Sequence, residues 1–130
     1  MGRLELRRGQ LEAARERLST ALELQQQLGD VTGLARTTAA LADLYAMANR
    51  FEEAAALLDN SVALNFEKGS PIGLAFNRQA LAALYDTTAR GSGPQAEKLQ
   101  GVLRQVENRL VQAESTLGRL LLPGESDARR

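Results

Sequence analysis

The sequence predicts an all-α protein in which antiparallel helix-turn-helix repeats stack as a short right-handed α-solenoid, followed by a long C-terminal helix. Two observations carry this prediction. Residues 9–48 align with residues 49–88 at a period of 40, and thirteen of the forty aligned positions are identical. Ala and Leu dominate the apolar residues, and only 4% of the chain is aromatic. A fixed period of this size is typical of stacked repeats, because each repeat leaves an apolar face that its neighbour covers.

The composition argues against catalysis and against charged partners. The 130 residues include 16 Lys and Arg and 16 Asp and Glu, so the net charge of zero creates no overall field for nucleic acid or an acidic membrane surface. Cys and His are both absent, which removes disulfides, thiolate metal sites and the commonest general base. No stretch approaches the roughly 20 apolar residues of a membrane span. We expect a cytoplasmic protein that is no enzyme and has no catalytic residue, cofactor, metal, nucleic-acid partner or membrane partner.

The first repeat is predicted to begin with a helix over residues 10–28. Gly29 is a natural stop for this helix, and Asp30 is placed to cap a second helix that runs to about residue 48. Apolar residues recur at helical spacing along both. The expected inward residues are Leu11, Ala14, Leu18, Ala21, Leu22 and Leu28 in the first helix, and Leu34, Thr38, Leu41, Leu44 and Tyr45 in the second.

The second repeat follows a tight turn at residues 49–50. Its first helix is predicted over residues 51–68 and ends at Gly69. Ser70 and Pro71 then start a helix over residues 71–89 as N-cap and first helical residue, where the missing N–H of proline costs nothing. Ser70 stands at the repeat position of Asp30. The expected inward residues are Phe51, Ala54, Leu57, Leu58, Ser61, Val62 and Leu64, then Leu74, Leu81, Leu84 and Tyr85.

These residues carry a family resemblance. The runs Leu41-Ala42-Asp43-Leu44-Tyr45 and Asn49-Arg50-Phe51-Glu52-Glu53-Ala54, with Leu58 and Leu64 beyond them, resemble the tetratricopeptide repeat. Residues 81–85 repeat the helix A half, and residues 9–14 repeat the turn and the start of helix B. The resemblance covers residues 9–88, and the period of 40 is similar to that of the long-repeat variety, found in scaffold proteins and in sensor regions of bacterial regulators. It implies a protein-interaction scaffold, or alternatively the sensor fragment of a larger bacterial regulator.

Both ends depart from the repeat pattern. Residues 1–8 are too few for a preceding helix A, and Glu5 stands where the pattern has Tyr, so we expect a helix remnant or disorder there. The chain is then either a fragment of a longer array or an unusually short member. After a turn at residues 90–93, one helix is predicted over residues 94–122, with a capping box from Ser92 to Gln95. We expect the tail, residues 123–130, to be disordered.

The last helix carries a heptad seam that allows two interpretations. One is a capping helix over the open end of the solenoid. The other is a self-association seam in a homodimer, because about 29 residues, roughly 43 Å, exceed what capping one helix pair requires. In that case the uncovered first helix, residues 10–28, would also pair with the second copy. Apolar residues alternate in steps of four and three over about three heptads. They are Leu99, Leu103, Val106, Leu110, Ala113, Leu117 and Leu120.

Few residues suggest chemistry. Glu52 and Glu53 form an adjacent carboxylate pair, but neighbours on a helix diverge by about 100°, so they are poorly placed to act together as acid and base. Tyr45 and Tyr85 occupy the packing position of the repeat, and we expect both in the core. Ser92 is better explained as a cap than as a nucleophile, because no base is present to activate it.

The resemblance implies a functional groove lined by the A helices. Its mixed character suits an extended or helical peptide, with Phe76 and Met47 giving apolar contacts and charged residues setting orientation. An acidic chaperone C-terminus is disfavoured as partner, because the positions that would grip it hold Ala39, Asp43, Gln79 and Ala83, which supply no cation. The expected partner-binding residues are Arg36, Ala39, Asp43, Met47, Phe76, Gln79, Ala83 and Asp86, with Ala46 and Thr87 beside them.

Overall fold

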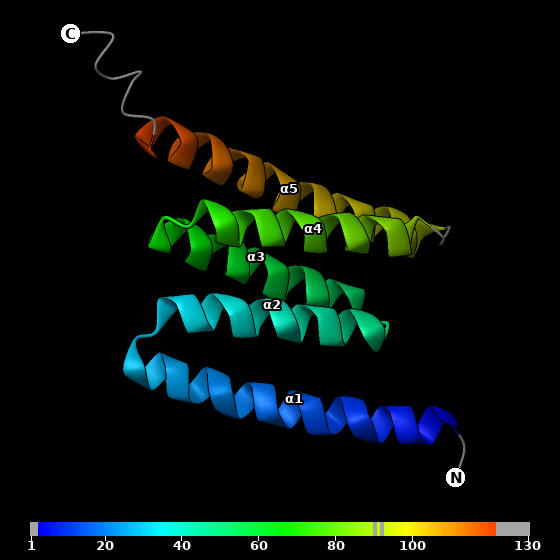
Figure 1. The fold of residues 1–130 in the computed structure, drawn as a ribbon. Helices are drawn as coiled ribbons and strands as arrows, with labels where there is room; N and C mark the ends of the chain where they lie inside the picture. The colour runs from blue at the N-terminus through cyan, green and yellow to red at the C-terminus, as the bar shows by residue number, and fades with distance from the viewer. Residues whose placement is uncertain (1–2, 90, 92, 122–130) are drawn as a thin grey trace, which may run out of the picture.

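The protein is a stack of helices. A computed structural model describes residues 3–89, 91 and 93–121, and these form α1 (Arg3–Leu28), α2 (Val31–Met47), α3 (Phe51–Lys68), α4 (Pro71–Thr88) and α5 (Pro94–Leu121). The helices lie in layers, with α1 at one end of the stack and α5 at the other (Figure 1). The predicted all-α repeat architecture is confirmed, with no strand in the described ranges. Among these same residues, no helix is long and apolar enough to cross a membrane.

Two turns repeat the same backbone geometry forty residues apart. Gly29 ends α1 with φ 68° and Gly69 ends α3 with φ 70°, a left-handed conformation that glycine adopts without strain. Asp30 then accepts the backbone N–H three residues on at 2.9 Å, and Ser70 accepts the corresponding N–H at 3.0 Å. Each side chain satisfies a donor that the first turn of the next helix leaves free. The predicted stops and caps are therefore confirmed.

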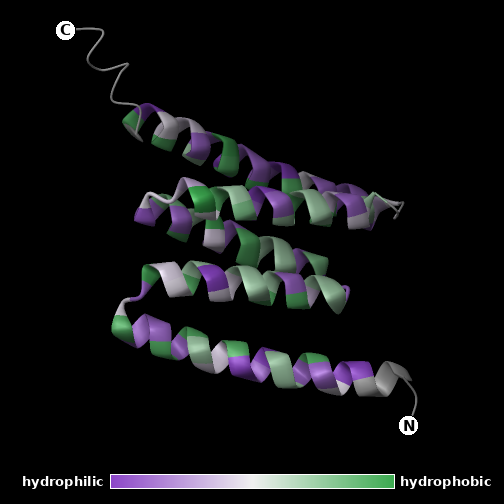
Figure 2. Cartoon of the chain, viewed as in Figure 1, coloured by the Kyte–Doolittle hydropathy of each residue, from purple (hydrophilic) through white to green (hydrophobic). Residues whose placement is uncertain are grey.

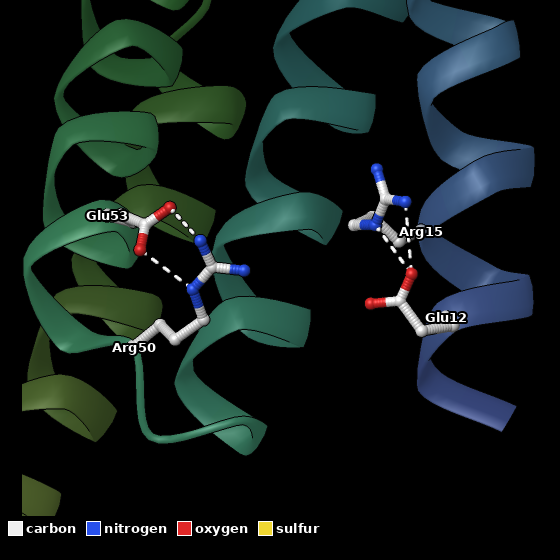
Figure 3. Close-up of polar contacts among 4 residues, drawn as sticks. All are labelled: Glu12, Arg15, Arg50 and Glu53. Atoms are coloured by element: carbon white, nitrogen blue, oxygen red, sulfur yellow. Dashed lines mark hydrogen bonds and ion pairs between the residues drawn. The ribbon is translucent and has the colours of Figure 1, made fainter. Parts of the chain in front are cut away.

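The turn between α2 and α3 has a different conformation and different stabilising contacts. Asn49 has φ 62°, a value that Asn tolerates better than most residues. The Arg50 backbone N–H donates to the Tyr45 carbonyl at 2.8 Å. The Arg50 guanidinium donates twice to the Glu53 carboxylate, at 2.6 and 2.7 Å (Figure 3). The same guanidinium lies 4.7 Å from the centre of the Tyr45 ring. Arg50 thus joins the end of α2 to the start of α3.

The core centres on α3, which contacts α2, α4 and α5. Ala54, Ala55 and Leu58 are completely buried there. Small alanines let the neighbouring helices approach closely, and the leucines supply most of the buried apolar area. The buried apolar cluster consists of Ala42, Ala54, Ala55, Leu58, Val62, Leu74, Leu81, Leu84, Leu103, Val106, Leu110, Ala113 and Leu117.

The first helix is longer than expected. It begins at Arg3, so residues 3–8 continue α1 instead of standing apart from a helix that starts at residue 10. The physical reason is that the Leu and Arg residues before Gly9 are good helix formers, and one glycine inside a helix costs only about 1 kcal/mol. In its N-terminal half, the half-buried Arg15 forms an ion pair with the exposed Glu12 at 3.0 Å (Figure 3).

Among the described residues, α2 is the one helix that packs extensively on α1. Leu18 and Leu22 are half-buried, whereas Leu58 and Val62, at the same repeat positions in α3, are buried. Leu28 is 80% exposed, which corrects the expectation that it points inward. The reason is coverage: α3 packs against three helices, while in the described part of the chain α1 packs extensively against α2 alone. Figure 2 shows hydrophilic and hydrophobic residues mixed along α1.

The last helix packs on α3 and α4 along its heptad seam. Leu103 and Leu110 are completely buried, and Leu99, Val106, Ala113 and Leu117 are buried as well. Leu120 is 72% exposed and lies outside the packed part of the seam. In this single chain the seam is therefore occupied by α3 and α4, as the capping interpretation expects.

Polar contacts flank that seam on both sides. Tyr85 donates its hydroxyl to the Glu107 carboxylate at 3.0 Å, and Arg109 donates to Asp59 at 2.8 Å. Arg78 also pairs with Glu114. These contacts fix the position of α5 along α3 and α4. The predicted capping box at Ser92, residue 122 and the predicted disordered tail at residues 123–130 lie outside the described residues.

Candidate partner-binding groove

A groove of about 670 Å³ lies between α2 and α4, and α3 contributes to its floor. Side chains three or four residues apart share one face of a helix, so each A helix presents one row to the groove. The floor between the two rows holds small residues such as Ala40 and Ala80. The α2 row is Thr32, Arg36, Ala39 and Asp43, and the α4 row is Ile72, Phe76, Gln79 and Ala83.

The two rows are related by the repeat. Each α2 wall residue has its α4 counterpart forty positions later, as Arg36 has Phe76 and Asp43 has Ala83. The backbone geometry recurs, so equivalent positions face the same side of the stack. The side chains do not recur, so two walls with the same backbone geometry carry different chemical groups.

The structure brings together six of the eight predicted groove residues, namely Arg36, Ala39, Asp43, Phe76, Gln79 and Ala83. Met47 and Asp86 do not line this groove. Ala46 and Thr87 do not line it either, and Thr87 instead borders a second hollow. The physical reason is position along the helix, because the lined stretch of α2 ends at Asp43, one turn before Met47.

Two wall residues, Thr32 and Ile72, were not predicted from the sequence. Each lies four residues before a predicted wall residue and therefore on the same helix face. That spacing was the signal that could have found them. Ile72 is 72% exposed and Phe76 is 65% exposed, so the α4 wall offers two large apolar side chains to solvent.

A chain of buried hydrogen bonds runs beneath the groove. The Asn65 side-chain N–H donates to the side-chain amide oxygen of Asn77 at 2.7 Å, and the side-chain N–H of Asn77 donates to the Ser61 hydroxyl at 2.9 Å. The Ser61 hydroxyl donates to the backbone carbonyl of Ala35 at 2.8 Å. Buried polar groups are stable when paired in this way, and a paired network fixes one arrangement of its helices. It therefore sets how far apart the α2 and α4 walls stand.

Gly73 is required by that network. A Cβ added to Gly73 would overlap the side chain of Asn65, which is held by its bond to Asn77. Gly33, at the same repeat position, is similarly crowded by Asp30 and Gln25. Both glycines serve close approach between the first turn of an A helix and the end of the preceding helix.

The α2 wall carries one charge of each sign. Arg36 and Asp43 are both exposed, and among the described residues neither forms an ion pair or a side-chain hydrogen bond. Partial desolvation raises the pKa of the Asp43 carboxyl above its ordinary value of 3.8. A cation from a ligand would relieve that cost, because an opposite charge favours the ionised carboxylate.

A second hollow, of about 490 Å³, lies where the α2–α3 turn meets the end of α4 and the start of α5. Glu52 and Glu53 line it, but Glu53 pairs with Arg50 and Glu52 lies 3.7 Å from Lys98. The two carboxylates face different cations and do not converge on one point. Within the described part of the chain, no cluster of three or more His, Cys, Asp or Glu residues is placed to hold a metal ion.

Stacked helix pairs around an open groove define a helical-repeat scaffold. The family model described as tetratricopeptide repeat matches residues 1–65, which is half of the chain, and the chain therefore belongs to that family. Tetratricopeptide repeats generally mediate protein–protein interaction and are generally not catalytic. The match covers α1, α2 and most of α3. No curated protein and no solved structure matches the chain.

Proposed function

We propose that this chain is a non-catalytic interaction module that binds a peptide segment of a partner protein along the groove between α2 and α4. The observation that carries the proposal is the pair of exposed apolar side chains, Ile72 and Phe76, on one wall of a preformed groove. Large apolar side chains that gather at a concave surface are typical of interaction sites. The proposal places this activity in the cytoplasm.

The floor of the groove supports the same proposal. Ala39, Ala40 and Ala80 leave room for a ligand to approach the helix backbones closely. The buried chain of bonds from Asn65 to Ala35 holds the walls apart without a ligand. A groove that is already formed spares the partner the entropic cost of ordering it. The same surface would act as the sensor site if the chain belongs to a larger bacterial regulator.

The test is an unbiased selection from a displayed random-peptide library against the whole chain, followed by Phe76→Ala. We expect Phe76→Ala to weaken the selected peptides at least tenfold, because aromatic anchors dominate such contacts. The matched control is Val111→Ala, since Val111 is an exposed apolar residue on α5, away from the groove. Peptides that bind Phe76→Ala as well as the unaltered chain would refute the groove as the site.

Self-association through α1 is a second candidate, because one specific observation favours it. Leu18 is half-buried on α1, whereas Leu58, at the same repeat position, is completely buried. A second copy of the chain would cover this face. Light scattering behind size exclusion tests it: a mass near twice 14.1 kDa that falls to one chain in Leu18→Glu supports pairing, and a mass near 14.1 kDa at all concentrations refutes it.

A further inference from the structure

The two walls of the groove differ in character. The α2 wall is polar and carries Arg36 and Asp43, while the facing α4 wall presents Ile72 and Phe76. Arg36 and Phe76 occupy equivalent positions of the two repeats, and so do Asp43 and Ala83. A ligand that fits both walls needs charged groups on one side and apolar groups on the other.

We infer that the groove selects an extended peptide with an acidic side chain for Arg36, a basic side chain four residues away for Asp43, and apolar side chains between them for Phe76 and Ala80. This inference rests on the proposed function and names the chemistry of the partner. An extended strand points successive side chains to opposite faces. One face of the peptide therefore meets the polar wall and the other meets the apolar wall.

The spacing of the two wall charges sets the spacing in the peptide. Arg36 and Asp43 are seven residues apart on α2, and a rise of 1.5 Å per residue separates their backbones by about 10 Å. Helix side chains lean toward the N-terminus, and Arg is longer than Asp, so the Arg36 head group lies farther away still. Strand residues on one face recur about every 6.6 Å, so two such steps, about 13 Å, match the pair. Charged residues only two positions apart in the peptide, about 6.6 Å, would lie too close together to reach both wall charges.

The walls also decide which end of the site takes the longer side chain. Ala83 is the repeat counterpart of Asp43 and lines the same groove, and its small side chain leaves room beside Asp43 for the four-carbon stem of a lysine or the fork of an arginine. Phe76, the repeat counterpart of Arg36, is large, so a short acidic side chain suffices for Arg36. One charge of each sign gives no advantage to a polyanion such as nucleic acid, whose binding depends on several cations together.

Fluorescence anisotropy with short labelled peptides tests the inference. The lead probe contains Glu-Leu-Ser-Leu-Lys between Gly-Ser flanks, and three companions carry Glu and Glu, Lys and Lys, or Gln and Gln at the two charged positions. We expect the Glu/Lys probe to bind two- to fivefold more tightly than either like-charge probe, the range for partly exposed ion pairs. Raising the salt from about 50 to about 500 mM should reduce that preference, because screening weakens exposed charges.

Charge-reversal variants of the protein give the most decisive test of the charge selectivity. Arg36→Glu should make the Lys/Lys probe the tightest binder, and Asp43→Lys should make the Glu/Glu probe the tightest. Arg36→Gln and Asp43→Asn serve as neutral variants that remove each preference without reversing it. Both positions are exposed, so circular dichroism should show the same helicity in every variant.

Several outcomes would overturn the inference. They are equal binding of all four probes, an unchanged order in the reversed variants, no binding of the lead probe at millimolar concentration, or tighter binding of a helical probe with Glu and Lys seven residues apart. If binding is equal but Phe76→Ala abolishes it, the proposed groove stands and only its charge selectivity is wrong. If peptides from the unbiased library survive Phe76→Ala, the proposed function itself is wrong.

Discussion

The side-chain amide of Asn77 on α4 donates to the Ser61 hydroxyl on α3, and that hydroxyl donates to a backbone carbonyl of α2. One path of hydrogen bonds thus joins the three helices beneath the groove. Asn77 is 1% exposed and Ser61 is completely buried, so neither can exchange its partner for water. This path links the internal packing of the repeat to the spacing of the walls that a ligand meets.

Asn77→Ala should lower the free energy of unfolding by about 1–3 kcal/mol, because it leaves the buried Asn65 amide without its acceptor and removes the bond that the Ser61 hydroxyl accepts. Urea denaturation measures the change. Gln79→Ala is the matched control on the same helix, where an exposed side chain should change stability by less than about 0.5 kcal/mol. Equal stability of the two variants would show that the network does not hold the helices.

Gly73→Ala and Gly101→Ala should have opposite effects. An added Cβ at Gly73 overlaps Asn65 and would break its bond to Asn77, so the melting temperature should fall. Gly101 lies inside α5 with nothing within 4 Å of an added Cβ, so Gly101→Ala should stabilise the chain by about 0.5–1 kcal/mol through helix propensity. A rise in melting temperature in both variants would contradict the close-approach role of Gly73.

The turns could be predicted because their signals are local. Gly29 with Asp30, and Gly69 with Ser70, end one helix and cap the next through bonds between residues close in sequence. The groove positions Arg36 and Phe76 came from the repeat, which carries backbone geometry from one copy to the other. Asn77 could not be predicted as part of a buried network, because the equivalent position of the first repeat holds Thr37. No local pattern shows that a polar residue will find buried partners on other helices.

Leu110→Asp should unfold the chain, whereas Val111→Asp should not. Leu110 is completely buried against α3 and α4, so the change removes about 2–5 kcal/mol of packing and also buries an unpaired carboxylate. Val111 is 48% exposed on the outer face of the same helix. Circular dichroism melts and size exclusion report the result. A folded, smaller species in Leu110→Asp would contradict capping and support a seam between two copies.

Tyr85 should make stability fall at alkaline pH. Burial, and secondly the bond to Glu107, raises the pKa of the Tyr85 phenol above its ordinary value of 10.0. Folding then favours the protonated phenol, so this contribution is complete below the unfolded pKa and is lost as the pH rises through the folded pKa. Melting temperatures from pH 8 to 11 should decline less in Tyr85→Phe than in the unaltered chain. Identical declines would show that Tyr85 contributes nothing to this dependence.

The seam of α5 shows what a sequence pattern leaves open. The spacing of Leu103, Val106 and Leu110 predicts an apolar stripe, but the same stripe fits α3 and α4 of its own chain or a helix of another copy. The choice depends on contacts between segments far apart in sequence. For the same reason, the periodic leucines of α1 could not reveal that Leu28 lies uncovered.

Nuclear magnetic resonance with a peptide from the unbiased selection tests the central claim most directly, because it locates binding residue by residue. Chemical shifts of the alanine methyl groups are followed during titration of the labelled chain. Binding in the groove predicts the largest changes at Ala39, Ala40, Ala80 and Ala83, with little change at Ala113 on α5. Changes concentrated on α1 or α5, with those four methyl groups unmoved, would contradict the proposed groove.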